Sequence, residues 1–390
     1  MSIKIEPCAH ISGTRYGTAE RQYVNEVLDN GVLWYLSGKK CKEFVEKAQH
    51  YYNIPYCVGG SSGSAVIHAA VAALELPPGS EVITSPVTDM GTLIGILYQN
   101  LIPVFADITF PNCNISAETI EKCITPRTRA IIPVHLAGNP CDMEPIMKLA
   151  GKHNLYVVED CAQANGTIYH GKPVGTIGNI GCFSLNESKH LSAGEGGYAL
   201  TASEKLYQNL HNYMDKYYDR LGTGSRLAAL APNYRMTEMQ YAVAIAQLDK
   251  LESIRKRRRA AGNFLSSALK NVPGITVPQE LPDSVSNWWF YMFTYDGDRE
   301  KLSAKLAENK IGHTIGYIDP AYKWPLFRNK SFFPGGIWPA EVIAGKTYEY
   351  NADNCPVTED FMNKAMRLVI NQYTPDEKLE RIVEVISQNA

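Results

Sequence analysis

The 390-residue sequence has no long hydrophobic run and no strong excess of either charge. Its most apolar stretch, residues 93–105, is interrupted by Gln99, Asn100 and Pro103, whereas a helix that crosses a bilayer needs about 20 apolar residues. Residues 1–7 lack the apolar core of a signal peptide. The formal net charge is -2, which gives no reason to expect nucleic acid or an anionic membrane as a partner. We therefore expect a soluble cytoplasmic protein.

The sequence also lacks paired cysteines. Its nine cysteines are odd in number and scattered, and no Cys-x-x-Cys pair occurs. Neither a disulfide framework nor a zinc site is indicated, and reduced thiols in a cytoplasm fit best. The nine histidines show no paired ligand spacing, so no metal site is predicted.

The hydrophobic pattern predicts an α/β fold. Short β-rich runs alternate with helical patterns over the first two thirds of the chain, which is typical of a mainly parallel, doubly wound sheet. The predicted strands are residues 81–85, 103–106, 130–135, 156–159, 181–183 and 198–201, and the predicted helices are residues 64–74, 92–100, 143–153 and 204–214. Ligands bind at the carboxyl ends of strands in such sheets, and Asp160 lies at one of these ends.

A smaller α+β domain is predicted to follow. Thr237-Glu238-Met239-Gln240 fits a capping box that starts a long helix. Beyond it come a strand-like run at 288–295 and helices at 299–309 and 376–388. We expect a large domain over residues 1–254 and a small one over 255–390. The five consecutive cations at 255–259 point all round a helix, so we interpret them as a solvated segment.

One lysine stands in a turn rich in small residues. Lys189 lies between Ser188 and the cluster Gly194-Glu195-Gly196-Gly197, and an upstream apolar strand ends in Asp160. Pyridoxal phosphate (PLP) enzymes need a lysine for the Schiff base and an aspartate that keeps the pyridine nitrogen protonated. Lys189 and Asp160 are therefore the candidate catalytic residues of a PLP site.

Four further segments fit a PLP site, although each alone has a simpler explanation. The Gly/Ser turn over 59–65 offers free amides to a phosphate, but it is also a plain capped helix start. Ala162 and Gln163 follow Asp160 in what is otherwise an acidic turn. Ser184 is a possible phosphate ligand or a turn former, and Asn233 lies in a loop before the long helix.

Together these segments resemble a known family, the DegT/StrS sugar aminotransferases, which have the aspartate aminotransferase fold (fold type I). The resemblance runs from about Tyr56 to Leu251. Its motifs are Ser62-Gly63-Ser64-Ala65, Glu81-Val82-Ile83, residues 102–107, residues 131–136, Glu159-Asp160-Cys161-Ala162-Gln163-Ala164, Phe183-Ser184, Ser188-Lys189-His190, Gly194-Glu195-Gly196-Gly197 and residues 233–238. The C-terminal third matches more loosely.

The resemblance implies a large domain with a mainly parallel seven-stranded sheet flanked by helices, and a smaller α+β C-terminal domain. Lys189 would form the Schiff base and carry the proton, Asp160 would pair with the pyridine nitrogen, and Gln163 would contact the ring hydroxyl. Ala162 would lie against the ring. The phosphate would be held by the turn of Gly63, Ser64 and Ala65, by Ser184, and by Asn233 from the neighbouring subunit of a homodimer with a shared active site.

One position departs from the family. Asp89 stands where an aromatic side chain usually stacks on the cofactor. Such a face contributes roughly 0.5–1.5 kcal/mol beyond its area burial, so cofactor retention should be weaker. We expect Asp89 to lie near the cofactor and to tune amine exchange.

The resemblance implies an aminotransferase that moves an amino group from glutamate or glutamine to a keto-sugar, free or nucleotide-linked, or to a keto-cyclitol. Ping-pong kinetics are expected. Tyr35, His190, Tyr317 and Tyr322 are the candidate substrate contacts. Two alternatives stay open: a PLP enzyme that eliminates, decarboxylates or condenses, and a non-catalytic sensor on the same fold. A lysine at 189, where some relatives have histidine, disfavours a sugar dehydratase.

Overall fold

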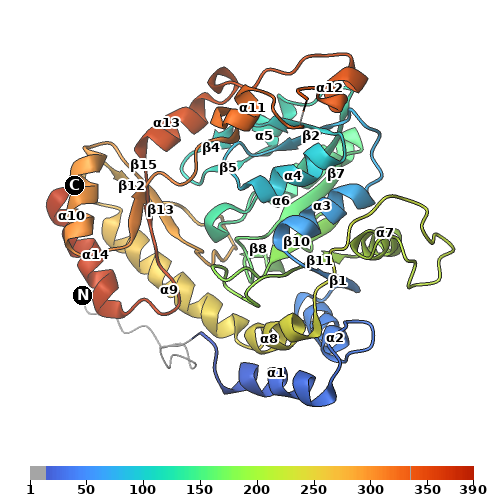
Figure 1. The fold of residues 1–390 in the computed structure, drawn as a ribbon. Coiled ribbons are helices and arrows are strands. Elements are labelled where there is room, and N and C mark those ends of the chain that lie inside the picture. Colours follow the sequence, from blue (N-terminus) through green and yellow to red (C-terminus); the bar gives the residue numbers. More distant parts are fainter. Residues whose placement is uncertain (1–14, 334) are drawn as a thin grey trace.

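A seven-stranded sheet forms the centre of the computed structural model, which describes residues 15–333 and 335–390 (Figure 1). Residues 1–7 and Cys8 lie outside the described residues. The strand order is β1-β11-β10-β7-β6-β2-β3; β11 is antiparallel to both neighbours and the other pairs are parallel. The strands are β1 (Tyr56–Gly60), β2 (Glu81–Thr84), β3 (Ile102–Phe105), β6 (Thr128–Ile132), β7 (Tyr156–Asp160), β10 (Ile180–Ser184) and β11 (Gly197–Thr201).

Helices cover both faces of this sheet, and two hairpins extend its loops. The elements are α1 (Thr18–Asn30), α2 (Lys40–Tyr52), α3 (Gly63–Ala73), α4 (Met90–Tyr98), α5 (Ala117–Glu121), α6 (Met143–His153), α7 (Glu204–Met214), β4 (Ile108–Thr109) with β5 (Asn114–Ile115), and β8 (Ile168–Tyr169) with β9 (Lys172–Pro173). The six predicted strands and four predicted helices all form, with shifts of a few residues at their ends. The edge strand β1 was not predicted, because its Gly-rich end reads as a turn.

A second, four-stranded antiparallel sheet has the order β12-β13-β15-β14. Its elements are β12 (Ile275–Thr276), β13 (Tyr291–Tyr295), β14 (His313–Ile315) and β15 (Ala365–Leu368), with α10 (Arg299–Glu308) and α14 (Asp376–Asn389). One face packs on α10 and α14. The other face, with Met292 and Ala365, packs with Val87 and Leu136 from loops after β2 and β6. The small sheet therefore lies over the carboxyl ends of the large one.

Two helices in succession join the sheets, α8 (Glu238–Leu248) and α9 (Leu251–Leu269) (Figure 1). The predicted capping box of Thr237 and Gln240 forms at the start of α8. The expected domain boundary at residue 254 falls inside α9, and the division into two domains stays a prediction. The prediction that residues 255–259 form a solvated segment is partly wrong, because Arg257 and Arg258 are buried.

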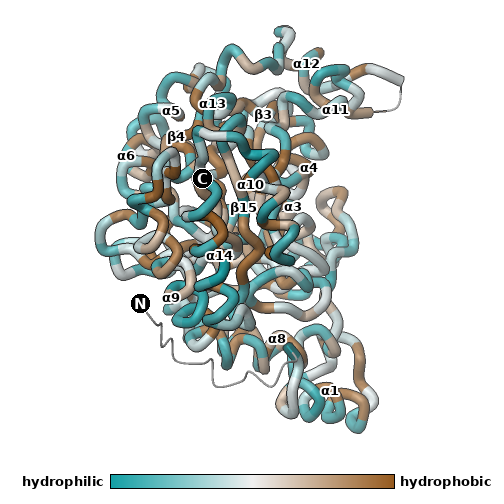
Figure 2. Tube along the Cα trace, turned by 90° about the vertical axis from the view of Figure 1, so that its left-hand side faces the viewer, coloured by the Kyte–Doolittle hydropathy of each residue, from teal (hydrophilic) through white to brown (hydrophobic). Residues whose placement is uncertain are grey.

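Three short helices, α11 (Pro325–Arg328), α12 (Pro339–Ala344) and α13 (Pro356–Lys364), lie in the C-terminal third. From this part of the chain, Tyr322, Phe327, Trp338 and Tyr348 pack on the core of the large sheet. Figure 2 shows hydrophobic segments gathered in the interior and hydrophilic ones along outer helices such as α10. In the described part of the chain, no helix has both the length and the apolar character needed to cross a membrane.

Candidate active site

A cavity of about 370 Å³ opens at the carboxyl ends of β7 and β10, beside Trp289, which lies just before β13. The N-termini of α3 and α4 form another part of its wall. Most of the residues that the sequence analysis assigned to the cofactor lie around this one space. The lining residues are Ser62, Gly63, Ser64, Ile67, Thr88, Asp89, Gly91, Thr92, Asp160, Ala162, Gln163, Ser184, Asn186, Ser188, Lys189, Glu195 and Trp289.

Lys189 lies in the turn after β10 with its side chain directed to the cavity. Its Nζ atom is 3.5 Å from the ring centroid of Trp289. Burial lowers the pKa of Lys189 to about 8, although the carboxylates of Asp160 and Asp89 oppose this shift. Such an amine is uncharged in a large fraction of molecules at slightly alkaline pH, as a nucleophile or base must be.

Asp160 is the last residue of β7 and is only 4% exposed. Thr92 Oγ1 donates a hydrogen bond of 2.6 Å to one carboxylate oxygen, and the Ala162 amide donates one of 3.0 Å to the other. Burial raises the pKa of Asp160, and these hydrogen bonds and the Lys189 charge work against the rise. No Lys, Arg or His among the described residues forms an ion pair with this carboxylate. A cationic group in the cavity would therefore stabilise it.

The N-terminus of α3 faces the cavity with Gly63 and Ser64. The amides of a first helical turn have no acceptor within the helix and attract anions. The Ala65 amide was expected to help bind the phosphate. Instead it donates a hydrogen bond of 3.1 Å to the Ser62 side chain, as part of the N-cap. Ser184, at the end of β10, lies next to Gly63. The expected phosphate ligands of this protomer are thus brought together, with the Ala65 amide already engaged.

Gln163 is buried and fixed at both ends of its amide. Its Oε1 atom accepts a hydrogen bond of 2.8 Å from the Ala137 amide, and its Nε2 atom donates to the Tyr317 hydroxyl at 3.2 Å. Tyr317, an expected substrate contact, therefore lies beside the cavity. Ala162, next to Asp160, lines the wall as well.

Asp89 lines the cavity and is exposed to it. The same carboxylate caps α4, accepting a hydrogen bond of 2.9 Å from the Gly91 amide. Its negative charge favours the protonated amine of Lys189 and also acts on Tyr317. The residue therefore has a structural role and an electrostatic one.

Four expected site residues lie elsewhere in the protomer. Asn233 is exposed and pairs with Asp215 through a backbone bridge. The Tyr35 hydroxyl donates to Asp215 at 2.9 Å, outside the cavity. His190 is fully buried, and burial together with the Arg258 charge lowers its pKa well below the ordinary value. Tyr322 is a core residue whose hydroxyl donates to Glu359 at 2.7 Å. Within one chain, none of the four faces the cavity.

Thr92 and Trp289 are among the wall residues to which sequence reasoning assigned no role, although they contact Asp160 and Lys189. Thr92 lies one turn after Asp89, and no local pattern distinguishes it from other threonines. Trp289 belongs to the strand-like run predicted over residues 288–295, whose aromatic residues fit a strand core better than a pocket wall. The strand β13 begins only at Tyr291, so Trp289 is free to point to the cavity.

A cluster of buried groups, His135, Glu159 and Cys161, has the spacing of metal ligands, with ligand atoms within 4.8 Å of one another. The Glu159 carboxylate accepts hydrogen bonds from the amides of Gly175, Ile177 and Gly178. It also pairs with His135 Nε2 at 3.1 Å. This network uses the carboxylate as a structural anchor for the loop after β9.

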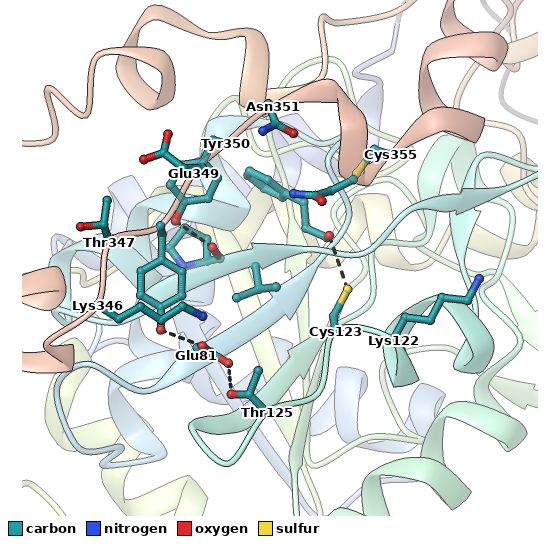
Figure 3. A pocket seen from close by; sticks show the side chains of 15 residues that line it. Glu81, Lys122, Cys123, Thr125, Lys346, Thr347, Glu349, Tyr350, Asn351 and Cys355 are labelled. Atoms are coloured by element: carbon teal, nitrogen blue, oxygen red, sulfur yellow. Dashed lines mark hydrogen bonds between the residues drawn. The ribbon is translucent and has the colours of Figure 1, made fainter.

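A second cavity, of about 500 Å³, lies beside β2 and β3 (Figure 3). At its floor the Tyr348 hydroxyl donates to Glu81 Oε1 at 2.7 Å. Glu81 is the first residue of β2, whereas ligand sites in such sheets lie at the carboxyl ends. No expected site residue lines this second cavity.

Comparison with known proteins gives the family of the chain. The DegT/DnrJ/EryC1/StrS aminotransferase family matches residues 15–387. The chain is 33% identical over 322 residues to GDP-perosamine synthase of Escherichia coli O157:H7, covering 80% of this chain and 85% of that protein. It is 31% identical over 379 residues to the dTDP-3-amino-3,6-dideoxy-alpha-D-galactopyranose transaminase of Aneurinibacillus thermoaerophilus, covering 96% of each.

Among solved structures, an aminotransferase from Psychrobacter cryohalolentis superposes with a TM-score of 0.85 at 26% identity, covering 96% of each chain. This likeness confirms the expected fold type I architecture. The family match spans both sheets and the residues that line the cavity. The protein is an aminotransferase, and its chain belongs to the DegT/DnrJ/EryC1/StrS aminotransferase family.

Proposed function

We propose that this aminotransferase uses PLP to move an amino group from an amino acid to a ketone on a sugar ring. The observation that carries the proposal is the placement of Lys189 and Asp160 on the wall of one cavity, together with the N-terminus of α3. PLP supplies an aldehyde that forms a Schiff base with a lysine, a protonated ring nitrogen that draws electrons, and a phosphate.

The donor set of the cavity fits these three groups. Asp160 is a buried carboxylate without an ion-pair partner among the described residues, and a protonated ring nitrogen would fill that role. The amides of Gly63 and Ser64 and the Ser184 hydroxyl would bind the phosphate. Gln163 would contact the ring hydroxyl, and Ala162 would lie against the ring.

Lys189 is the base that we propose for the proton transfer. Its Nζ atom, uncharged above the pKa of about 8, accepts the proton from Cα of the amino donor. Asp89 and Asp160 then stabilise the ammonium that results. The hydrogen bonds from Thr92 and the Ala162 amide favour the charged carboxylate of Asp160, against the effect of its burial on the pKa.

For the acceptor, we propose a nucleotide-linked keto-sugar. The names of the two sequence relatives refer to amino sugars that are linked to the nucleotides GDP and dTDP. A free keto-sugar or a keto-cyclitol is the alternative acceptor, and a screen of ketones against the aminated enzyme would distinguish them.

For the donor, we propose glutamate or glutamine, with its carboxylate bound by Arg367. This residue of β15 lies near two rings, with its guanidinium carbon 5.4 Å from the Phe290 centroid and 5.5 Å from that of Tyr317. Its Nε atom is buried without a hydrogen-bond partner among the described residues. A guanidinium with no ion-pair partner among the described residues favours an anion, and the donor's carboxylate is bonded to the same carbon as the reacting amine.

A homodimer with shared active sites is part of the proposal. Asn233 is exposed and does not line the cavity of its own chain, as expected for a residue donated to a neighbour. The guanidinium carbon of Arg220 lies 5.8 Å from the ring centroid of Trp34. This contact joins two exposed apolar loops. Exposed side chains of these loops are Leu33, Trp34, Leu36, Leu221, Leu227 and Leu230. Such a patch favours a protein interface, and a second copy of this chain would bring Asn233 to the partner's cavity.

A cytoplasmic location is also proposed, because the eight cysteines among the described residues are free thiols.

The test of the proposal is chemical. Borohydride reduction of the PLP-loaded protein, followed by peptide mass mapping, should place the label on Lys189. The visible absorption of the loaded protein should fade with glutamate or glutamine alone and return with the ketone. An unlabelled Lys189 would overturn the proposal, and intersecting initial-rate lines would contradict the ping-pong mechanism.

A further inference from the structure

The turn that carries Lys189 has only weak support of its own. The Lys189 amide donates to the Asn186 carbonyl, and the Glu187 amide donates to the Gly194 carbonyl, both at 2.9 Å. Glu187 and Ser188 are exposed. This exposed part of the turn is not held by packing, so its position depends on hydrogen bonds from other parts of the chain.

Four consecutive carbonyls of this turn receive such hydrogen bonds, and in the part of the chain that the structure describes two residues supply them. The Arg15 guanidinium donates to the carbonyls of Glu187 and Lys189, and at 3.2 Å to that of His190. Trp289 Nε1 donates to the Ser188 carbonyl at 2.8 Å. The turn is therefore held on one side by the N-terminal segment and on the other by a residue just before β13.

Both residues are in turn anchored to the helices that join the two sheets (Figure 1). On α8, Gln247 Nε2 donates to the Arg15 carbonyl at 3.3 Å. On α9, Arg258 Nη1 donates to the Trp289 carbonyl at 3.0 Å and is fully buried there. The helix pair α8–α9 thus fixes the two supports of the turn relative to each other.

Trp289 also contacts the amine itself, since Lys189 Nζ lies 3.5 Å from its ring centroid. An indole face attracts an ammonium group. We propose that Arg15 and Trp289 are positioning residues for Lys189: they hold its turn from two sides, and the Trp289 ring holds the amine whenever it is not joined to the cofactor. This inference rests on the proposed function of Lys189.

The proposal predicts a loss of rate without a matching loss of stability. The carbonyls concerned belong to a partly exposed turn, where water replaces a lost donor at little cost. A misplacement of about 1 Å in a reacting group, in contrast, costs up to about a hundredfold in rate. Removing either support should therefore affect Lys189 before it affects folding.

The variants are Arg15→Gln and Trp289→Phe, which remove the donors but keep similar size and, for Phe, the ring. Two matched controls exist elsewhere in the chain. Trp324 Nε1 donates to the Asp319 carbonyl at 2.8 Å, and Arg299 Nη1 donates to the Met362 carbonyl at 3.1 Å. Trp324→Phe and Arg299→Gln thus lose the same kinds of hydrogen bond away from the turn.

Two quantities are measured for each variant. The first is kcat of the PLP-loaded enzyme, expected to fall about tenfold or more in Arg15→Gln and Trp289→Phe. The second is the rate at which cyanate carbamylates Lys189 in the cofactor-free protein, followed by peptide mass mapping. We expect it to rise at least about threefold, because a loosened turn exposes the amine. Arg15→Lys, which keeps a cationic donor, should recover part of both.

Values at the level of the two controls would overturn the proposal. A fall in kcat with an unchanged carbamylation rate would overturn it as well, since the residues would then act on the substrate. Failure of Arg15→Lys to recover either quantity would contradict the role of Arg15 as a donor. Borohydride labelling of Lys189 in the unaltered enzyme checks the proposed function separately, so the two failures are distinguishable.

Discussion

Gly63 at the start of α3 lies so close to Ser184 at the end of β10 that an added Cβ atom would be 2.8 Å from the Cβ atom of Ser184. Gly63→Ala should therefore push the N-terminus of α3 away from β10 and separate the proposed phosphate ligands. We expect the dissociation constant of PLP, measured by absorbance titration, to rise about tenfold, because about one charge-assisted hydrogen bond to the phosphate would be lost. Gly151→Ala in α6, where nothing lies within 4 Å, should leave it unchanged.

Asp160 should contribute to catalysis while its charge lowers the stability of the folded, cofactor-free protein. Because burial raises its pKa, folding favours the protonated form, and the charged carboxylate costs stability at pH values above that raised pKa. Asp160→Asn in the cofactor-free protein should therefore keep or raise the unfolding temperature. Transamination should fall by at least about a hundredfold, because an amide cannot hold the ring nitrogen protonated. A large fall in unfolding temperature would contradict this assignment.

The uptake of PLP by the cofactor-free protein should depend on the charge of Lys189. Only the uncharged amine attacks an aldehyde, so the uptake rate should rise with pH and level off above about 8. Asp89→Asn removes a negative charge that favours the ammonium form, so the midpoint should move to lower pH. Stopped-flow absorbance over a pH series measures it, with the exposed Asp283→Asn as control. An unmoved midpoint would show that Asp89 does not act on Lys189.

Arg367 should affect the half-reaction with the amino donor and leave the half-reaction with the ketone nearly unchanged. Arg367→Met removes the proposed partner of the donor's carboxylate, which is equivalent to about 1.5–3 kcal/mol, or roughly 10- to 100-fold in apparent affinity. Single-turnover absorbance with glutamate should show this loss, whereas the reaction of the aminated enzyme with the ketone should change little. Arg381→Met, at an exposed position outside the site, is the control. If only the ketone half-reaction weakens, Arg367 binds the acceptor instead.

Arg258 should matter for stability more than its neighbours in the cationic run. Its guanidinium donates to the carbonyls of Trp288, Trp289 and Ile370. Arg258→Met leaves these acceptors unpaired, so we expect the free energy of unfolding to fall by roughly 2–4 kcal/mol in chemical denaturation. The exposed Lys256→Met should change it by less than about 0.5 kcal/mol. Equal effects of the two substitutions would contradict the role of Arg258.

Much of the fold follows from local pattern. The strands ending in Asp160 and Ser184 and the helices over 143–153 and 204–214 form where their hydrophobic periodicity predicts them. The candidate cofactor residues follow from the same patterns, because they occupy strand ends and helix starts that meet at one edge of a parallel sheet. The substrate contacts were harder to predict, since Tyr322 and His190 are aromatic residues whose burial no local pattern reveals.

The sequence by itself determined the α/β class, the family resemblance, and the candidate roles of Lys189 and Asp160, because these depend on residue types at short spacing. Only the tertiary structure decided that Trp289 contacts Lys189, that Arg15 holds the same turn, and that Arg258 is buried within a run of cations. These contacts join segments as far as 175 residues apart. Local sequence propensities do not predict contacts between residues so far apart in the chain. Such contacts form only when the chain folds and the small sheet packs over the large one.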